Sequence, residues 1–554
     1  MTIHPALIHF HPRVAAWFAA SYPAPTDAQA QAWPVIASGA HALITAPTGS
    51  GKTLTAFLWA LDRLLTGHYA AGTTRVLYVS PLKALNTDIQ RNLTTPLTEL
   101  GAAFQAAGET MPRILAQTRS GDTTTSARSA MLRKPPEILI TTPESLNLLL
   151  TSKSGRATLT GVQAVILDEI HDVVPTRRGV QLITAVERLA ALAGEFQRIA
   201  LSATVNPLEA VAAWVGGYRL AHHGGAVSYT ARPVTIVRAK DEKHIDLRVA
   251  LPADAEGAIA EGEKIWTPIA ASLRTMIAQN RATLIFVNGR RLAEQITLRI
   301  NEGQQEPIAY AHHGSLSREI RGAVEQRLKD GQLKAIVATS SLEMGIDIGE
   351  LDEVAMLQSP PTIAATLQRT GRAGHQVGAT SRGTLIPSHG HDFLAAAALT
   401  EAVKARDIEP LQAINGALDV LAQQLISMTA HDTWDIDALY AAVRCAAPYH
   451  ALPREHFDLV MEMLAGRYAS TRVRALNTRV SLDRAANTVH ARKGAVLALY
   501  TAGGSIPNRG YFALRHSVTN ASIGELDEEF VWEAVVGQVF AMGHAALAYQ
   551  TDHA

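Results

Sequence analysis

A glycine-rich loop between a predicted strand and a predicted helix constrains the fold of this 554-residue chain more than any other feature. The loop follows the apolar run 41–46, precedes an amphipathic stretch that ends near residue 65, and reads Ala46-Pro47-Thr48-Gly49-Ser50-Gly51-Lys52-Thr53. A turn of this kind at the start of a helix directs backbone N–H groups and the positive end of the helix dipole at phosphate. The sequence therefore predicts an α/β fold with a phosphate site at one edge of a sheet.

Each part of this loop has a predicted role in holding a nucleoside triphosphate. We expect Lys52 to reach the β- and γ-phosphates and Thr53 to bind Mg²⁺. The predicted ligands of the loop are thus ATP and Mg²⁺. The remaining contacts with phosphate are expected from Thr48, Gly49, Ser50 and Gly51.

Two carboxylates follow a second buried strand. The apolar run 164–167 is followed by Asp168-Glu169-Ile170-His171, which places the carboxylates at the carboxyl edge of a parallel sheet, where open α/β folds bind ligands. Asp168 is suited to hold Mg²⁺ through water, and Glu169 is suited to orient or deprotonate an attacking water. Such a pair on its own is more often a solvated loop, but the upstream phosphate loop favours the catalytic interpretation.

Apolar runs of strand length alternate with amphipathic stretches in two successive regions. Such alternation is typical of parallel sheets with helices on both faces, so we expect two α/β units. The predicted strands are 41–46, 75–80, 137–141, 162–167 and 198–202 in the first unit and 282–287, 334–339, 351–357 and 383–386 in the second.

A cluster of cations is predicted to act across the two units. If residues 362–370 are helical, Gln368 and Arg369 each lie about one turn from Arg372 on one face. That face can meet a γ-phosphate held by the other unit, so the arginines would act as fingers that stabilise the transferred charge. A surface helix with ion pairs is the ordinary alternative for these residues alone.

Composition limits the possible partners. The chain has 50 Lys plus Arg and 50 Asp plus Glu, so a polyanion must be held by a local groove rather than by a net field. No apolar run reaches the roughly 18 residues of a membrane span, and the N-terminus lacks the pattern of a signal peptide, which favours a cytoplasmic protein with no membrane contact. The lone cysteine, Cys445, is expected to be a buried thiol.

These motifs occur in the order found in superfamily-2 helicases of the DExH type, which the chain resembles. Gln29 with the preceding Pro25-Thr26 resembles the Q motif that reads adenine, and residues 201–204 resemble the Ser-Ala-Thr element. Gly345 and Asp347 resemble motif V, which contacts the nucleotide, and residues 368–375 resemble motif VI. The resemblance implies two tandem RecA-like P-loop domains that use ATP to move along a single strand.

A closer resemblance is to the large helicase-related (Lhr) family. It implies a winged helix and a β-rich module after the two RecA-like domains, with domains at 1–225, 226–408, 409–470 and 471–554. It also implies a single-stranded DNA-dependent ATPase that moves 3′ to 5′ and unwinds DNA duplexes and RNA:DNA hybrids in DNA repair. The resemblance rests on residues 46–53, 80–86, 118–123, 141–146, 312–317, 371–375, 503–507 and 524–530.

The same resemblance implies a track for the strand, made of hydroxyl groups, backbone N–H groups and a few cations. Capping of a strand end is an equally good interpretation of Thr141 and Thr142. The expected contacts are Lys83, Arg119, Thr141 and Thr142 on the first unit and Asn288, Arg290 and Thr339 on the second.

Two departures from the family keep alternatives open. Relatives commonly read Trp-Asp-Arg where this chain has Leu482-Asp483-Arg484, so a stacking wedge is predicted to be lost. Relatives also continue well beyond Gly543, so we expect the module 471–554 to be incomplete. These departures leave open an ATP-gated clamp that closes on nucleic acid without unwinding it. An RNA helicase is the other alternative, because the motor motifs hold the backbone and do not encode the sugar.

Overall fold

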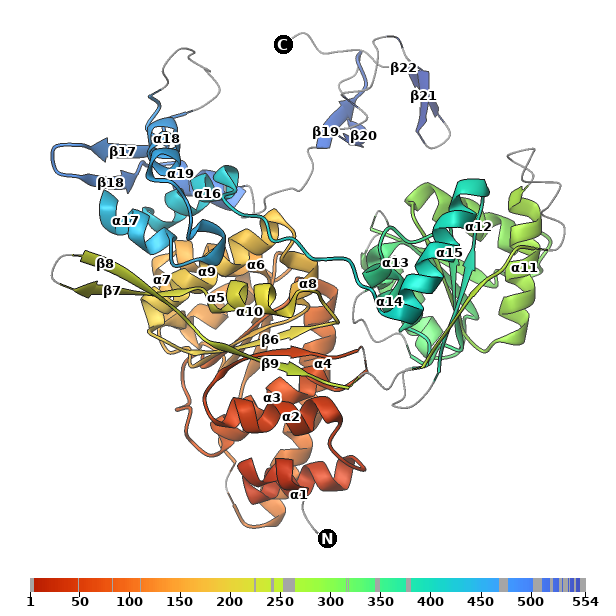
Figure 1. Cartoon of the computed structure of the whole chain (residues 1–554), viewed down its shortest axis with the longest axis horizontal. Coiled ribbons are helices and arrows are strands. Elements are labelled where there is room, and N and C mark those ends of the chain that lie inside the picture. Colours follow the sequence, from red (N-terminus) through yellow and green to blue (C-terminus); the bar gives the residue numbers. More distant parts are fainter. Residues whose placement is uncertain are drawn as a thin grey trace.

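Two parallel sheets organise the larger part of the chain (Figure 1). We analysed a computed structural model. It describes residues 4–47, 49–81, 83–109, 111–223, 226–240, 244–252, 265–314, 316, 318–343, 349–374, 380–467, 477–501, 511–518, 522–527, 531, 537, 539–542 and 545–548. The predicted architecture of two tandem RecA-like domains followed by a winged helix is confirmed.

The first sheet has the order β3-β4-β2-β5-β6-β1-β9, and its neighbouring strands are parallel. The apolar runs predicted as strands form its centre. The edge strand β3 was missed because its Ala-Gln-Thr-Arg sequence has no apolar run. The strands are β1 (His41–Thr45), β2 (Val76–Val79), β3 (Ala116–Arg119), β4 (Ile138–Thr141), β5 (Ala164–Leu167), β6 (Gln197–Ser202) and β9 (Val234–Arg238).

Helices cover both faces of this sheet because alternate residues of each buried strand point to opposite sides. Ile44 and Tyr78 pack on one face, whereas Leu43 and Val79 pack on the other. The first face carries α1 (Pro12–Ser21), α2 (Asp27–Ala37), α3 (Lys52–Leu65) and α4 (Lys83–Ala106). The second carries α6 (Pro143–Thr151), α7 (Lys153–Leu159), α8 (Ile170–Val173), α9 (Arg177–Ala193) and α10 (Leu208–Gly216), and α5 (Thr125–Arg133) follows β3.

The second sheet has the order β10-β15-β14-β11-β13-β12 and is also parallel. Its strands are β10 (Ile245–Val249), β11 (Thr283–Val287), β12 (Ala309–His312), β13 (Ala335–Ala338), β14 (Glu353–Leu357) and β15 (Ser381–Ile386). Its helices are α11 (Trp266–Gln279), α12 (Arg290–Asn301), α13 (Arg318–Lys329), α14 (Ile363–Thr370) and α15 (Gly390–Ala405).

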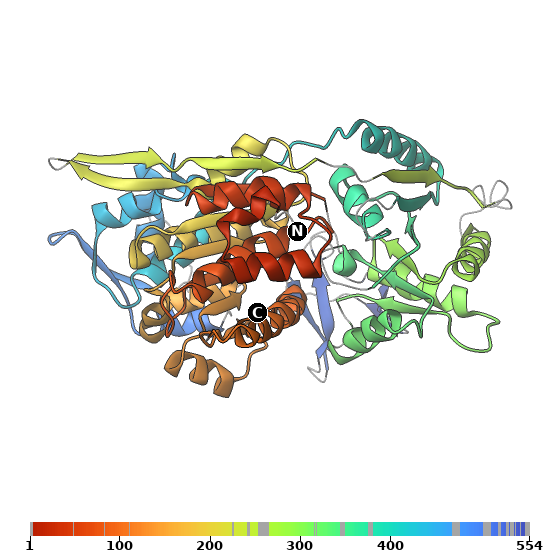
Figure 2. The ribbon, with the colours of Figure 1, turned by 90° about the horizontal axis from the view of Figure 1, so that it is seen from below.

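The crossing between the two units lies later in the chain than the sequence suggested. Strand β9 pairs with β1, so the first sheet includes Arg238, and the second sheet begins with Ile245 in β10. The expected boundary at residues 225 and 226 instead falls in a hairpin of β7 (Tyr218–His223) and β8 (Ala226–Ala231). Figure 2 shows this hairpin extending from the first unit along the winged-helix region. The expected and observed boundaries differ because the pairing of distant strands, which local composition does not reveal, decides where each unit ends.

The winged helix follows and includes strands beyond residue 470, where we expected a separate module. Trp434 of β16 pairs with Val489 of β18, and β18 pairs with β17. Phe457, Val460, Met461 and Leu464 share one buried face of α18, whereas Leu418 at the start of α16 is 40% exposed. The elements are α16 (Leu418–Met428), β16 (Trp434–Asp435), α17 (Ile436–Val443), α18 (Arg454–Leu464), β17 (Val480–Asp483), β18 (Thr488–Ala491) and α19 (Ala495–Thr501).

The end of the chain forms two antiparallel strand pairs within the described residues. Cys445 is buried, as predicted, and burial raises the pKa of its thiol to about 12. Within the part of the chain that the structure describes, no helix has the length and apolar character needed to cross a bilayer. The strand pairs are β19 (Tyr511–Arg515) with β20 (Ser522–Asp527) and β21 (Val539–Met542) with β22 (Ala545–Ala548).

Candidate nucleotide and nucleic-acid sites

The phosphate loop connects β1 to α3, as the sequence predicted. Gly49 and Gly51 both adopt left-handed backbone conformations, with φ of +81° and +79°. A Cβ on Gly51 would lie 2.7 Å from Nε2 of Gln29, so both the backbone and the close approach require glycine there. Ser50 caps the turn by donating from Oγ to the Pro47 carbonyl at 2.7 Å. Thr48 lies outside the described residues.

Lys52 is held over this loop near two carboxylates. Its ammonium donates to the carbonyl oxygens of Ala46 and Pro47, at 2.9 Å for Pro47, and the residue is only 8% exposed. Burial lowers the pKa of Lys52, and the charges of Glu169 and Asp168 oppose that shift. A buried ammonium beside carboxylates is suited to hold a phosphate once a cation shares the site.

Thr53 and Asp168, the two residues predicted to hold Mg²⁺, meet at a third side chain. The Tyr78 hydroxyl donates to Oδ2 of Asp168 and is also hydrogen bonded to Thr53. Burial raises the pKa of Asp168 to about 7, and the neighbouring charge of Glu169 adds to the shift. A buried carboxylate close to a hydroxyl offers the oxygen ligands that a hard divalent ion such as Mg²⁺ prefers. Sequence reasoning missed Tyr78, because its position in β2 gives no local sign of its partners.

His171 links the carboxylate motif to the Ser-Ala-Thr element and to motif VI. The backbone N–H of Ala203 donates to Nδ1 of His171 at 3.2 Å. Nε2 of the same ring is hydrogen bonded to Nε2 of the Gln368 side-chain amide at 2.5 Å. Oε2 of Glu169 lies 3.5 Å from the same ring. Sequence reasoning assigned no role to His171, but its contacts place it between the two α/β units.

The arginines of motif VI lie differently from one another. The predicted helix is present as α14, but Arg372 lies just beyond its end. Arg369 forms an ion pair with Glu343 and donates to Oδ1 of Asn288 at 3.1 Å, within its own unit. Arg372 donates to the Glu343 carbonyl at 2.7 Å, and its charge contributes to lowering the pKa of Lys52, so it lies close to the phosphate loop. The finger role of both stays a prediction.

Gln29 lies directly behind the phosphate loop. Its side-chain oxygen accepts from the Thr26 N–H at 2.9 Å and completes a capping box at the start of α2. The Thr26 hydroxyl donates to the Ser50 carbonyl at 2.8 Å, which ties this segment to the loop. Reading of adenine by Gln29 stays a prediction, and Gly345 and Asp347 lie outside the described residues.

A cavity of about 380 Å³ opens between the two units beside the phosphate loop. Its walls come from β1 and the Ser-Ala-Thr element on one side and from α14 on the other. Gln368 and Gly371 line it together with three cations, Arg238, Lys240 and Arg406. The cavity thus continues the phosphate site into a cleft that both units form.

The residues predicted to follow the strand on the first unit gather at the carboxyl end of β3 and β4. The Thr141 hydroxyl donates to the Arg119 carbonyl at 2.8 Å. Thr142 caps the start of helix α6 by accepting from the Ser145 N–H. Arg119 and Thr142 line a common cavity. The Lys83 side chain lies outside the described residues.

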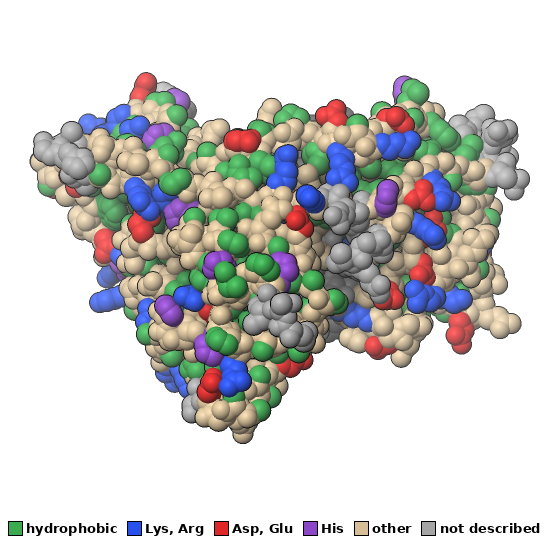
Figure 3. All heavy atoms as spheres, turned by 60° about the horizontal axis from the view of Figure 1, so that its bottom comes forward, with side chains coloured by type: hydrophobic (Ala, Val, Ile, Leu, Met, Phe, Trp, Pro, Cys, Tyr) green, Lys and Arg blue, Asp and Glu red, His purple; other side chains and the backbone are tan. Residues whose placement is uncertain are grey.

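The predicted contacts on the second unit also gather at one sheet edge. Asn288 follows β11, Arg290 begins α12 and Thr339 follows β13. Strands β11 and β13 are parallel neighbours, so their carboxyl ends lie side by side. Nδ2 of Asn288 donates to the Ser359 carbonyl at 2.8 Å, which fixes its orientation. Basic and acidic side chains are interspersed on the face in Figure 3, in keeping with the lack of net charge.

Comparison with known families follows the same order of domains. Residues 26–211 match the DEAD/DEAH box helicase family, and residues 269–376 match the helicase conserved C-terminal domain. Residues 401–552 match the large helicase-related protein, winged helix domain. The Methanothermobacter thermautotrophicus "ATP-dependent helicase Lhr-Core" is 38% identical across 96% of this chain. The chain belongs to the large helicase-related family.

Other relatives extend the same similarity. "Lhr helicase/uracil glycosylase" of Escherichia coli is 40% identical across 96% of this chain. The structure of Mycobacterium smegmatis helicase Lhr bound to single-stranded DNA and AMP-PNP is 42% identical, with a TM-score of 0.84, and the match covers 96% of this chain and 66% of that chain. The chain spans 38% of the Escherichia coli relative and 61% of the Methanothermobacter one, so it corresponds to a part of these longer Lhr proteins.

Proposed function

We propose that this chain is an ATP-dependent DNA helicase that moves 3′ to 5′ along single-stranded DNA and separates DNA duplexes and RNA:DNA hybrids during DNA repair. The observation that carries the proposal is the contact between His171 of the carboxylate motif and Gln368 of motif VI. It places a residue of the second unit next to the carboxylates and the phosphate loop of the first. The Lhr relatives named as ATP-dependent helicases support the same activity.

Each residue of the cleft has a separate role in ATP hydrolysis. Lys52 and the backbone of Gly49 to Lys52 bind the β- and γ-phosphates. Glu169 orients a water and accepts its proton as the water oxygen bonds to the γ-phosphorus and the bond to the ADP oxygen breaks. Arg372 stabilises the charge on the transferred group, and Arg369 follows when the units close. Thr53 and Asp168 would hold Mg²⁺, which neutralises charge on the β- and γ-phosphate oxygens.

Closure of the cleft would couple hydrolysis to the strand. His171 contacts both the Ser-Ala-Thr element and Gln368, so a change at the carboxylates alters how the second unit sits. The expected strand contacts lie at carboxyl sheet edges on both units. Opening and closing the cleft would therefore change the distance between the strand contacts on the first unit and those on the second.

A clamp that binds DNA without unwinding it is the second candidate, and one observation favours it. Leu482, at the position where the family resemblance implies a tryptophan, packs against the winged-helix core in strand β17. A leucine packed in this way offers no ring to stack on a base.

The test compares ATP hydrolysis by this chain with no nucleic acid, with single-stranded DNA and with single-stranded RNA, followed by strand displacement from 3′-tailed and 5′-tailed duplexes. We expect stimulation by DNA and displacement from the 3′-tailed duplex only. Stimulation by DNA without displacement would favour the clamp. Stimulation by RNA alone would refute the choice of DNA.

A further inference from the structure

The segment that connects the second α/β unit to the winged helix lies against the first unit. It comprises residues 406–413, which we call the strap, and Figure 1 shows it crossing from the second unit to the winged helix. The strap begins at Arg406, the C-cap of α15, whose left-handed φ of +55° turns the chain away from that helix. Leu411 and Ala413 then pack against the core of the first unit. The strap thus contacts the first unit although it emerges from the second.

One residue of the first unit, Asn206, holds the strap with both its side chain and its backbone. Nδ2 of Asn206 donates to the Ile408 carbonyl at 3.2 Å, and the Asn206 carbonyl accepts from the Leu411 N–H at 2.6 Å. Asn206 follows the Ser-Ala-Thr element by two residues, and buried Ile408 lines the cleft cavity together with Thr204 of that element. The strap is therefore anchored beside the Ser-Ala-Thr element.

The next residue of the strap, Glu409, holds the second unit. Its Oε1 accepts from the N–H of Ile363, the first residue of α14, at 2.8 Å. The Thr362 hydroxyl accepts from the Ala365 N–H at 3.0 Å, so two side chains satisfy two of the free N–H groups at the start of this helix. A carboxylate at this end also interacts favourably with the positive end of the helix dipole.

Because Ile408 and Glu409 are adjacent, the strap ties the start of α14 to the segment that follows the Ser-Ala-Thr element. The last turns of the same helix are held separately, through the contact of Gln368 with His171. Attachment at both ends fixes the direction of a helix as well as its place. The direction of α14 matters because Arg369 lies in its last turn and Arg372 lies just beyond it.

We propose that Glu409 is a positioning residue for ATP hydrolysis. Through the strap, it orients α14 so that the motif VI side chains meet the γ-phosphate when the cleft closes. The inference rests on the proposed function, since it assumes that Arg369 and Arg372 act on the transferred phosphate. It also gives the strap a second role besides joining the second unit to the winged helix.

Steady-state ATP hydrolysis by the full chain, with saturating oligo-dT, tests this role. Glu409→Ala removes the acceptor for the Ile363 N–H, whereas Glu409→Gln keeps an oxygen that can accept from it. We expect the Ala variant to lower kcat about tenfold, because a misplacement of about 1 Å far from the chemistry can cost up to about 10²-fold. The KM for ATP should change less than about twofold, because the phosphate loop lies on the first unit and the lost interaction acts in the transition state.

The Gln variant should hydrolyse ATP at nearly the rate of the unchanged chain. Glu401→Ala is the matched control, because it removes the same charge from a side chain that is 77% exposed and pairs with Lys404 within α15. Thermal unfolding of each variant separates positioning from stability. A purely structural role would lower the Tm of Glu409→Ala and leave the kcat of its folded form unchanged, and that result would overturn the inference. Equal losses of kcat in the Ala and Gln variants would also overturn it.

The anchor on the first unit gives a second measurement. Asn206→Ala should lower kcat roughly threefold, since the backbone bond to Leu411 remains. Because both substitutions release the same strap, Asn206→Ala with Glu409→Ala should lose little more than Glu409→Ala alone. Fully additive losses would overturn the coupling through the strap. Failure of single-stranded DNA to stimulate hydrolysis by the unchanged chain would instead overturn the proposed function.

Discussion

The first α/β unit meets the winged-helix domain and the second α/β unit through contrasting interfaces. Toward the winged helix, Val180 of α9 packs in the winged-helix core and Tyr218 stacks on His450 with ring centroids 3.5 Å apart. Toward the second unit, the described side-chain contact centres on His171 and Gln368. A broad packed interface keeps two domains together, whereas a narrow polar one leaves room for movement. We therefore expect the winged helix to move with the first unit while the second unit opens and closes.

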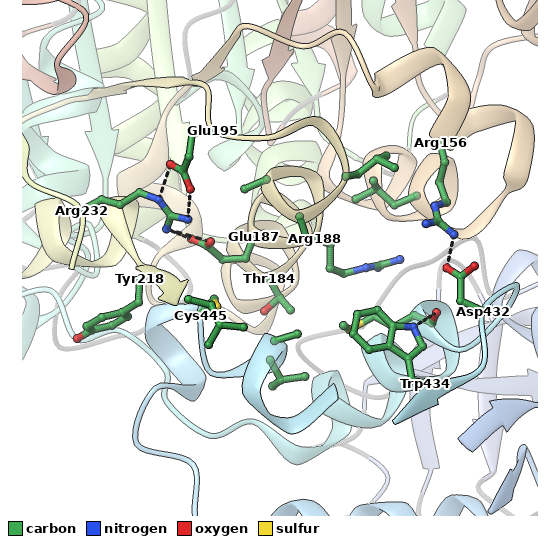
Figure 4. A pocket seen from close by; sticks show the side chains of 18 residues that line it. Arg156, Thr184, Glu187, Arg188, Glu195, Tyr218, Arg232, Asp432, Trp434 and Cys445 are labelled. Atoms are coloured by element: carbon green, nitrogen blue, oxygen red, sulfur yellow. Dashed lines mark hydrogen bonds and ion pairs between the residues drawn. The ribbon is translucent and has the colours of Figure 1, made fainter. Parts of the chain in front are cut away.

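The two interfaces also differ in how their charged side chains are paired. At the winged-helix interface, Arg232 pairs with Glu187 and Glu195 beside a cavity of about 470 Å³, and Arg156 pairs with Asp432 across it (Figure 4). In the cleft between the α/β units, burial shifts the pKa of Lys52 down and that of Asp168 up to about 7. The first interface balances its own charges, whereas the cleft is arranged to receive charges from outside.

The largest expected effect is on catalysis in the cleft. Glu169→Gln should retain binding of a fluorescent ATP analogue and lower turnover by about 10²–10⁴, the usual contribution of a general base. Glu195→Gln is the control at the other interface and should keep its turnover. A Glu169→Gln variant that still hydrolyses ATP at the normal rate would remove this residue from its role.

The raised pKa of Asp168 makes stability depend on pH. A folded-state pKa above the unfolded value means that the folded protein binds the proton more tightly, so the contribution to stability is present below about pH 4 and is lost as pH rises toward 7. Without Mg²⁺, Asp168→Asn should lose less stability than the unchanged chain between pH 5 and 7.5, by a few kcal/mol at most. Thermal unfolding across this range measures it. Parallel curves would contradict the raised pKa of the buried Asp168 carboxyl.

Substitutions at the bridge between the units should be coupled. His171→Ala and Gln368→Ala should each lower DNA-stimulated hydrolysis on the order of tenfold, the effect of about 1.4 kcal/mol on a barrier. Because they remove the same contact, the double variant should lose little more than either single one. Fully additive losses would show that the two side chains act separately and that the bridge does not couple the units.

The smallest effect is expected at the winged-helix interface. Arg156→Ala removes the ion pair with Asp432, which is partly exposed and should contribute no more than about 1 kcal/mol to the free energy of unfolding. Urea unfolding measures the loss, and ATP hydrolysis should be unchanged. Loss of hydrolysis in this variant would show that the winged helix does more than follow the first unit.

The sequence by itself determined the features that depend on local order. The glycine loop at residues 46–53, the apolar runs of the central strands and the helix before Arg372 were all readable, because periodicity and turn chemistry act over a few residues. Their order along the chain was enough to place it among helicases.

Only the tertiary structure decided which distant residues meet. The contacts of Tyr78 with Thr53 and Asp168, and of His171 with Gln368, join segments that the sequence keeps far apart. The pairing of β9 with β1 and of β16 with β18 likewise moved two expected domain boundaries. Such contacts arise from the packing of whole sheets and helices, so no local pattern carries a sign of them.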